Sequence, residues 1–286
     1  MQVIMAESLK NALKEISENQ DAAIIANGTD MLPRIRDEGL KVEKILDISA
    51  LDRELSYIKV DGNSVRIGAM TTVTEIENSS EFRGSLNAFY EVASKFGGPQ
   101  VRNRATIGGN ICAASSSEDF IPLLMVLDAG VVVQSINGKR TIKLDNFITG
   151  KRTVARRNDE ILVEVQFSKP GDDYRTGFEK VGRRNILIIN LVNMAMAMSL
   201  RQGKISDVRI ALNRVSGKVP GRARLTEGFL RGKEVKSDVL ESAREKLGEE
   251  LRLTSDFRAS SEYRVHLAQA ILEKLLNRLA GGSANE

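Results

Sequence analysis

The sequence predicts an α+β fold, with α/β segments in the first part of the chain and a small antiparallel sheet with helices in the last. Helical and strand patterns alternate over the first residues, and hairpin patterns follow them. After the break at Lys169-Pro170-Gly171, two apolar strands precede a run of helical stretches. Because the 286 residues exceed one average domain, two or three compact units are expected.

Composition excludes several classes of protein. The apolar share of 42% and the charged share of 28% are typical of a globular chain. Basic residues exceed acidic ones only by 42 to 38 and are interleaved with them, which does not indicate a nucleic-acid-binding face. No apolar stretch reaches the roughly 18 residues that span a bilayer, and the first residues lack a leader pattern, so a cytoplasmic protein is expected. The single cysteine, Cys112, cannot form an internal disulfide or hold an iron–sulfur cluster alone.

The first segment predicts a small α/β unit of about fifty residues, near the lower size of an independent core. Ser8 is placed to cap a helix, and strands are expected at residues 22–26 and 42–48. The apolar stripe of that helix consists of Leu9, Ala12, Leu13 and Ile16.

The turn after residues 22–26 is a candidate anion site. Residues 27–33 (NGTDMLP) end a strand in a glycine-containing turn and begin a short helix, with Thr29 or Asp30 placed to cap it and Pro33 in its first turn. Free N–H groups at a helix start attract anions, so a diphosphate would fit. Since Asp30 would repel a phosphate, we assign it to capping or bracing the loop. An ordinary strand–turn–helix is the alternative reading.

A second glycine-containing stretch, Thr106-Ile-Gly-Gly-Asn110, follows in the middle of the chain. Adjacent glycines open the backbone, and Thr106 and Asn110 offer hydrogen-bonding groups, which suits a phosphate or a planar ring close to the backbone. Asp119 and Pro122 then introduce an apolar run with helical character. A plain turn is the alternative for an isolated Gly-Gly-Asn, and the earlier loop at 27–33 favours the binding site.

Around that stretch, the pattern predicts hairpins at residues 57–67 and 131–144, a strand at 160–167 and a helix at 82–96. Most of the apolar face of that helix is core, but Phe96, at its exit, could instead flank a ring. The basic patches at residues 151–157 and 214–224 are interpreted as solvated loops or a partner surface.

In the last third, residues 191–200 predict a strand buried on both faces. Its methionines, at period two, are not interpreted as a copper site because no Cys or His lies near them. A return strand is expected at 208–215, and helices at 224–231, 237–251 and 261–279. His266 is not interpreted as part of a catalytic triad, because nucleophilic catalysis needs a positioned set of groups.

The sequence lacks G-x-x-x-x-G-K-[ST], G-x-G-x-x-G, C-x-x-C and H-E-x-x-H. Two candidate phosphate loops with almost no acid–base machinery indicate that a cofactor performs the chemistry. We therefore predict no catalytic residue and no metal ligand in this chain.

Five motifs resemble, in order and spacing, the FAD-binding medium subunit of molybdenum hydroxylases, the group of xanthine dehydrogenase, aldehyde oxidoreductase and carbon monoxide dehydrogenase. The motifs are residues 25–32 (IANGTDML), 67–72 (IGAMTT), 99–111 (PQVRNRATIGGNI), 117–122 (SEDFIP) and 160–162 (EIL). The resemblance continues through residues 178–184 (FEKVGRR) and covers nearly the whole chain.

The resemblance implies FAD as the cofactor and an FAD-binding domain of two α/β subdomains, 1–55 and 56–170, followed by an α+β domain at 171–286. It places Asp119 beside the cofactor and Phe96 and Leu162 on its rings. The implied diphosphate loops are Ile25, Ala26, Asn27, Gly28, Thr29, Asp30 and Met31, then Thr106, Gly109 and Asn110; weaker assignments are Thr71, Thr72 and Lys180. Asn27 stands where the family usually has glycine, which is tolerable with a negative φ or as an Asn in the left-handed region. Residues 185–190 (NILIIN) also depart from the family pattern.

The resemblance further implies a hetero-oligomer. Electrons would pass from a molybdenum-cofactor large subunit through a 2Fe-2S small subunit to this FAD and then to an outside acceptor. Two alternatives remain open: a free-standing FAD-dependent reductase with its own proton donor, and an assembly subunit that has lost FAD. Intact Thr106–Asn110 and Asp119 argue against the second.

Overall fold

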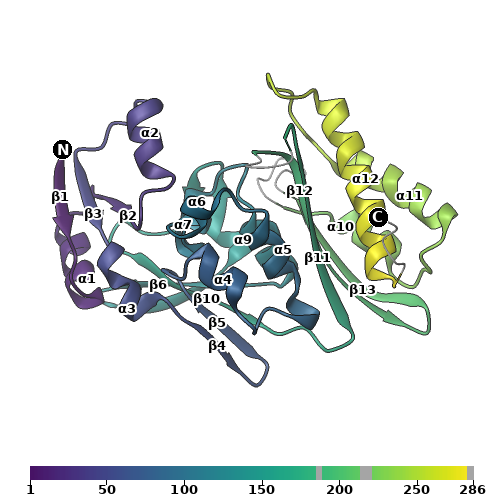
Figure 1. Ribbon diagram of the computed structural model, residues 1–286, viewed down its shortest axis with the longest axis horizontal. Helices are drawn as coiled ribbons and strands as arrows, with labels where there is room; N and C mark the ends of the chain where they lie inside the picture. Colours follow the sequence, from purple (N-terminus) through teal and green to yellow (C-terminus); the bar gives the residue numbers. More distant parts are fainter. Residues whose placement is uncertain (185–188, 213–220, 282–286) are drawn as a thin grey trace. The chain divides into compact units, whose positions relative to one another are not determined.

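The computed structural model describes residues 1–184, 189–212 and 221–281, and the chain forms two compact units (Figure 1). Unit 1 comprises Met1–Asn78, Gly98–Ala114 and Asp128–Ser168. Unit 2 comprises Ser79–Gly97, Ser115–Leu127 and Lys169–Glu286. Both units thus use stretches that are separated in the sequence. The mixture of helices with small sheets confirms the predicted α+β fold class.

Unit 1 begins with a parallel sheet in the order β1-β3-β2, formed by Gln2–Met5, Lys44–Asp47 and Ala23–Ile25. The predicted helix is α1 (Leu9–Glu18), and the Ser8 side chain accepts a hydrogen bond from the N–H of Asn11. Its apolar stripe packs against Leu46 because the 3.6-residue repeat places that stripe on one face. The short helix α2 (Met31–Asp37) follows β2.

The second sheet of unit 1 is antiparallel, in the order β4-β5-β10-β6-β7. Both predicted hairpins are present, as β4 (Ile58–Asp61) with β5 (Ser64–Gly68) and β6 (Gly130–Ser135) with β7 (Gly138–Lys143). The predicted strand at 160–167 is β10 (Ile161–Ser168), which joins the two hairpins.

Short elements complete unit 1. They are η1 (Ser49–Leu51), α3 (Asp52–Leu55), α4 (Val73–Asn78), α6 (Pro99–Arg102), α7 (Ile107–Ala113), α9 (Leu144–Phe147), β8 (Ile148–Gly150) and β9 (Thr153–Val154).

Unit 2 is built on an antiparallel sheet of β11 (Tyr174–Gly182), β12 (Asn190–Arg201), β13 (Lys204–Leu212) and β14 (Gly221–Arg222). Its helices are η2 (Gly84–Leu86), α5 (Ala88–Ser94), α8 (Phe120–Val126), α10 (Arg224–Leu230), α11 (Ser237–Glu250) and α12 (Ser261–Leu279).

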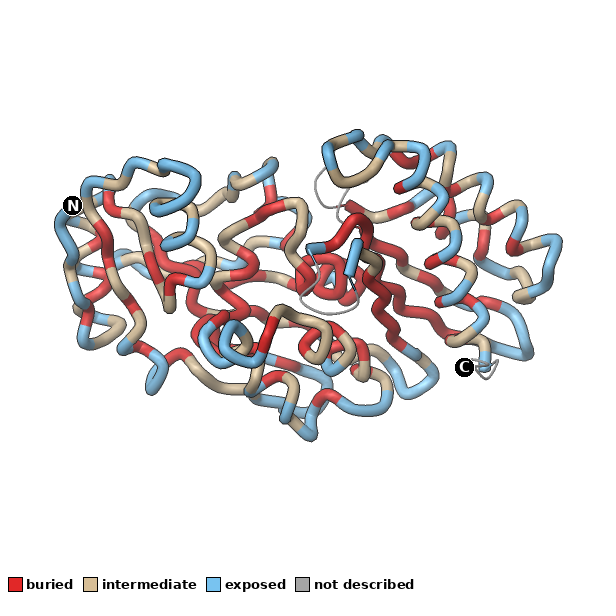
Figure 2. The backbone as a smooth tube through the Cα atoms, turned by 45° about the horizontal axis from the view of Figure 1, so that its top comes forward, coloured by how far each residue is buried: buried red, intermediate tan, exposed pale blue. Residues whose placement is uncertain are grey.

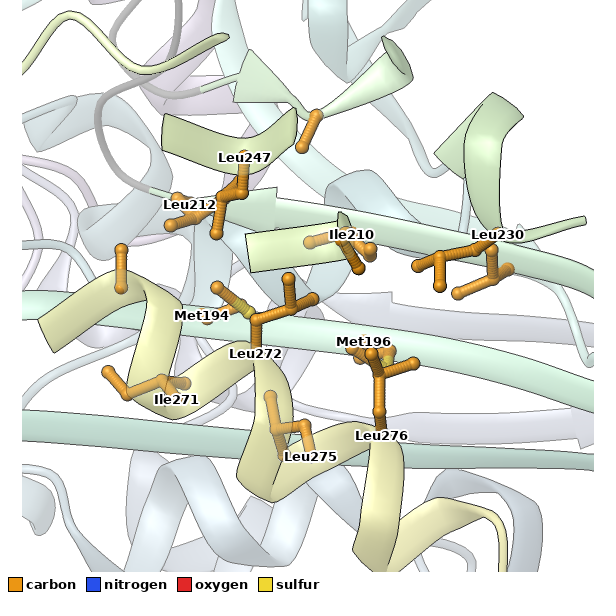
Figure 3. Packing of buried hydrophobic residues seen from close by; sticks show 14 of the residues in the cluster. Met194, Met196, Ile210, Leu212, Leu230, Leu247, Ile271, Leu272, Leu275 and Leu276 are labelled. Carbon is orange, nitrogen blue, oxygen red and sulfur yellow. The ribbon is translucent and has the colours of Figure 1, made fainter. Parts of the chain in front are cut away.

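Strand β12 is buried along most of its length, as predicted (Figure 2). Met194, Met196 and Met198 belong to one apolar core with α10, α11 and α12; in Figure 3, Leu272 and Leu276 of α12 lie against Met194 and Met196. Side chains alternate between the faces of a strand, so Asn193 lies on the other face, where it contacts the start of α8. The apolar run therefore serves packing on both sides.

Two predicted elements differ from the structure. The helix expected at 82–96 is shorter, because Gly84 adopts φ +59 and the chain makes a 3-10 turn at η2 before α5 begins at Ala88. The strand expected at 208–215 begins earlier, within β13, and its last residues lie outside the described residues. Most of the basic patch at 214–224 and residues 185–188 also lie outside them. Among the described residues, no helix is long and apolar enough to span a membrane.

Candidate functional site

The loop from Asn27 to Met31 connects β2 to α2 in unit 1, and we call it loop one. Gly28 has φ +76, a backbone conformation that is unfavourable for residues with a side chain. A Cβ at this position would also lie 2.5 Å from Cδ1 of Leu32. Position 28 therefore requires glycine for its backbone angle, whereas an added Cβ would meet only the side chain of Leu32.

Loop one leaves backbone donors unused. Within the described part of the chain, the N–H groups of Gly28, Thr29, Asp30 and Met31 donate to no backbone or side-chain acceptor. Asp30 occupies the N-cap position, but its side chain makes no capping hydrogen bond. The predicted capping is therefore wrong for Asp30, and the loop retains amides that an anion could accept from.

Asp30 instead braces the loop, which was the other predicted role. Nη1 of Arg152 lies 2.8 Å from each carboxylate oxygen of Asp30, and Nη1 of Arg34 lies 3.5 Å from Oδ2. The interpretation of residues 151–157 as a solvated or partner-binding loop is thus wrong for Arg152. Arg156 donates to backbone carbonyl groups of its own loop and of the residue that follows it, Glu160, at 2.6 Å.

The stretch Thr106–Asn110 is the start of helix α7 and not a turn. We call this stretch loop two, because the family resemblance assigns it as the second diphosphate-binding loop. Thr106 is the N-cap residue, and its Oγ1 accepts from the N–H of Gly109 at 3.0 Å. The N–H of Gly108 donates to the carbonyl of Ala69 at 2.9 Å, and a Cβ on Gly108 would lie 2.7 Å from that oxygen. Gly108 is therefore needed for packing, a role that sequence reasoning missed.

The structure brings loop one and α7 together within unit 1. Nδ2 of Asn27 donates to the carbonyl of Arg104 at 2.9 Å, next to the start of α7. At the other end of the helix, the N–H of Arg152 donates to the carbonyl of Ala114 at 2.8 Å while its side chain holds Asp30. The φ angle of Asn27 is not positive, so an asparagine is tolerated where the family usually has glycine.

The remaining candidates of unit 1 support this region. The Thr71 side chain is buried and bonds both the N–H and the carbonyl of Tyr57, while Thr72 caps α4 through Glu75. The carbonyl of Thr71 accepts from Ile107, the first residue of α7. Other candidates are Ile25, buried in β2; Ala26, which follows it; Asn110, buried in α7; and Leu162, buried in β10 beside a β-bulge.

Leu162 is preceded by a paired carboxylate. Nε and Nη2 of Arg140 lie 2.6 and 2.8 Å from the two oxygens of Glu160, and the N–H of Arg157 donates to it at 2.8 Å. The hydrogen bond from Arg140 is the main cause that lowers the pKa of Glu160 below its ordinary value. This ion pair fixes the start of β10.

Phe96, Asp119 and Lys180 lie in unit 2, where Asp119 is the centre of a buried network. Its Oδ2 accepts from Nζ of Lys180 at 2.5 Å, and its Oδ1 accepts from Nδ2 of Asn190 at 3.0 Å and of Asn193 at 2.9 Å. All four residues are buried, the most exposed being Lys180 at 7%. The ring of Phe96 lies 5.9 Å, between centroids, from that of Phe120, the residue that follows Asp119.

Sequence reasoning did not find Asn190 and Asn193. The only signal was their presence in an otherwise apolar strand, where an amide is costly unless it is hydrogen-bonded. Lys180 had been assigned only through the resemblance. The structure shows its side chain inside unit 2, paired with Asp119 and 3.4 Å from the carbonyl of Lys95.

Comparison with known proteins gives consistent matches along the chain. A family model described as the FAD binding domain in molybdopterin dehydrogenase matches residues 1–170, and one described as the CO dehydrogenase flavoprotein C-terminal domain matches residues 178–279. The nicotinate dehydrogenase FAD-subunit of Eubacterium barkeri is 33% identical over 267 residues, which are 91% of this chain and 90% of the relative. The xanthine dehydrogenase FAD-binding subunit of Escherichia coli O157:H7 is 30% identical over 281 residues, 97% of this chain and 96% of the relative.

Solved structures give the same picture. Carbon monoxide dehydrogenase from Hydrogenophaga pseudoflava, in a form that lacks the Mo-pyranopterin moiety of its cofactor, matches with a TM-score of 0.91 and 27% identity. The match covers 98% of this chain and 96% of that one.

Proposed function

Because this chain belongs to the family of FAD-binding domains in molybdopterin dehydrogenases, we propose that it is the flavoprotein subunit of a molybdenum-containing hydroxylase or dehydrogenase. The family resemblance predicted from the five motifs is confirmed, and so are FAD as the cofactor and oxidoreductase as the class. FAD, when bound, supplies the electron-transfer chemistry, and the residues of the chain bind and orient it.

We propose that loop one and the start of α7 bind the FAD diphosphate. The observation that carries this assignment is the set of unused N–H groups at Gly28 to Met31, in a turn whose positive φ at Gly28 favours glycine. Backbone N–H groups stabilise phosphate oxygens without contributing a side-chain charge. Thr106, Gly109 and Asn110 are proposed as the second half of the site, with Ile25 and Ala26 shaping the entry to loop one.

The ring-binding assignments are proposals of the same kind. Leu162 is proposed to pack on the flavin ring, as is Phe96, whose own unit holds Asp119 and Lys180 as further cofactor-binding residues. The support for Asp119 is that three donors fix its carboxylate orientation in advance of any ligand. Thr71 and Thr72 stay predictions as direct contacts, since in the structure they hold α4 and the start of α7.

Partners follow from the nature of the relatives, which are named as FAD subunits. We propose a hetero-oligomer with a molybdenum-cofactor large subunit and a 2Fe-2S small subunit, located in the cytoplasm. A free-standing reductase is not favoured by those relatives. The division into subdomains 1–55 and 56–170 and a domain 171–286 also stays a proposal.

The test is the visible absorption spectrum of the purified full chain after FAD is added and the excess removed. We expect retained flavin that denaturation releases intact, and its loss in a T106A/N110A variant. The matched control is T74A/N103A, which removes a Thr–Asn hydrogen bond of 2.6 Å elsewhere in unit 1. Absence of flavin from both the purified chain and its complex with co-expressed partners would refute the proposal.

A further inference from the structure

We infer that Arg152 is a positioning residue for the FAD diphosphate, which neutralises Asp30 and fixes loop one against the end of α7. The inference rests on the proposed function, which places the diphosphate at loop one. Arg152 lies outside every motif that carries the family resemblance. Its role follows from three features of unit 1: a backbone contact, a charge arrangement and a second tie at the opposite end of α7.

The backbone contact joins two unusual residues. Arg152 lies between β8 and β9 with φ +61, and Ala114, which ends α7, has φ 43. The left-handed region is unfavourable for residues with a Cβ, and surrounding contacts must hold such a conformation. Here the N–H of Arg152 donates to the carbonyl of Ala114 at 2.8 Å. The position of the Arg152 backbone is therefore fixed relative to α7.

The side chain of Arg152 then determines the charge beside loop one. A carboxylate at position 30 would repel a diphosphate, since like charges so close raise the free energy of the bound state. Nη1 of Arg152 lies 2.8 Å from both oxygens of Asp30, and Arg34 adds a second guanidinium at 3.5 Å. Because Arg34 also pairs with Glu38, with Nε 3.7 Å from Oε2, the guanidinium of Arg152 is the group that cancels the charge of Asp30 beside the loop. The side chains of Arg152 and Asp30 are 28% and 37% exposed, so salt screens this effect only in part.

A second hydrogen bond holds loop one near the opposite end of α7, so the contact of Arg152 is one of two that position the loop. Asn27 holds the beginning of loop one to the carbonyl of Arg104, before α7 starts. Arg152 holds the end of the loop, through Asp30, to the last turn of α7. With both ties in place, loop one has one position relative to loop two. Without Arg152, the loop is released at one end and the Asp30 carboxylate keeps only Arg34, at 3.5 Å, as a cationic partner.

The experiment measures the dissociation constants of FAD and of riboflavin for the full chain by quenching of flavin fluorescence. The variants are R152Q, R152K, D30N and R152Q/D30N. The matched control is R36Q, which removes another Arg–Asp pair of loop one's own helix: Nε of Arg36 lies 2.7 Å from Asp37, with 78% of the Arg36 side chain exposed. Riboflavin carries no phosphate, so it separates an effect on the diphosphate from an effect on the ring.

We expect R152Q to weaken FAD binding about tenfold and R152K to recover most of the loss, because the charge is retained. In the D30N background, the same substitution of Arg152 is expected to cost only about threefold, because no carboxylate is left to neutralise. Riboflavin binding stays unchanged in all variants, and R36Q binds FAD like the wild type. Higher salt reduces the difference between R152Q and wild type.

Each contrary result has a distinct meaning. If R152Q binds FAD as tightly as R36Q, the inference is wrong while the proposed function stands. If R152Q loses FAD and riboflavin equally, Arg152 has only a general structural role and the inference is again wrong. If the wild-type chain and its assembled complex bind no FAD, the proposed function fails and the inference fails with it. Should R152Q not fold, the comparison of R152K with wild type and of R152Q/D30N with D30N decides the question.

Discussion

Loop one of unit 1 and the Asp119 network of unit 2 differ in whether their polar groups have hydrogen-bond partners in the folded chain. Within the described residues, the amides of Gly28 to Met31 have no acceptor, whereas the Asp119 carboxylate accepts from three side chains. In loop one, Thr29 is exposed and Asn27, Asp30 and Met31 are half-buried, while Gly28 is buried, so most of the loop's N–H groups lie within reach of water until a ligand replaces it. Asp119 is 3% exposed and must be paired by the protein itself.

The difference separates two ways of preparing a binding site. A loop with unused donors gains its full stabilisation only when the ligand arrives, so its ligand raises the stability of the folded chain by mass action. In the buried network, the Asp119 carboxylate already has its three donors in the folded protein and holds its geometry without the ligand. We therefore expect changes in loop one to act mainly on FAD affinity and changes at Asp119 to act mainly on folding.

The largest expected effect concerns Asp119. D119L leaves the Lys180 ammonium buried without its carboxylate, and breaking a buried pair in this way costs about 3–5 kcal/mol. The double variant D119L/K180M removes both charges, so most of this loss is expected to return. The measurement is the free energy of unfolding in urea without FAD.

As a control for Asp119, D37N alters an exposed carboxylate on α2 and should leave the unfolding transition unchanged. A D119L variant as stable as D37N would contradict the view that this network is a folding element.

An intermediate effect is expected at Gly28. G28A introduces strain at positive φ and a contact with Leu32, which together cost about 1–2 kcal/mol of stability. The loss of FAD-binding free energy is expected to exceed this loss of stability, because the substitution moves the N–H groups of loop one. The control is G39A, where φ is +69 but no atom lies within 4 Å of the added Cβ. Equal FAD affinity in G28A and G39A would mean that the close approach at Gly28 does not shape the site. Thermal unfolding and flavin fluorescence measure the two quantities.

The smallest expected effect concerns Glu160, a paired carboxylate within unit 1. Its pKa is lowered in the folded state, so its stabilisation is present above the ordinary pKa of a glutamate and is lost as the pH falls through the folded pKa. Since Arg140 is 36% exposed, screening keeps the contribution to about 1 kcal/mol or less. Unfolding free energies of wild type and E160Q between neutral and acidic pH should converge as the pH falls. Parallel curves would show that the pair is not linked to folding.

Local patterns were enough to predict much of the fold. The stripe of α1, the two hairpins of unit 1 and the buried strand β12 were all predicted, because a 3.6-residue or two-residue repeat is visible in a short window. Strand β1 was not predicted: it spans only Gln2 to Met5 and shows no polar–apolar alternation, and it becomes a strand by pairing with β3. The helix expected at 82–96 was too long because the positive φ of Gly84, which lies inside an apolar pattern, cannot be read from the sequence.

The candidate site was predictable where glycine and short polar residues cluster, at Gly28 and at Thr106 to Asn110. It was not predictable where distant residues meet. Arg152 reaches Asp30 across 122 positions, and Lys180 reaches Asp119 across 61. Nothing in the residues next to Arg152 distinguishes it from its basic neighbours, so it was interpreted as part of a solvated loop.

The sequence by itself determined the periodicities, the glycine positions and the ordered motifs by which the family is identified, since each depends on neighbouring residues. Only the tertiary structure decided which carboxylates are paired, which amides remain without an acceptor and how the chain divides into two interleaved units. The physical reason is that the energy of a charge or an N–H group depends on what folding places within a few ångströms of it. That neighbourhood is a property of the folded chain and not of its local order.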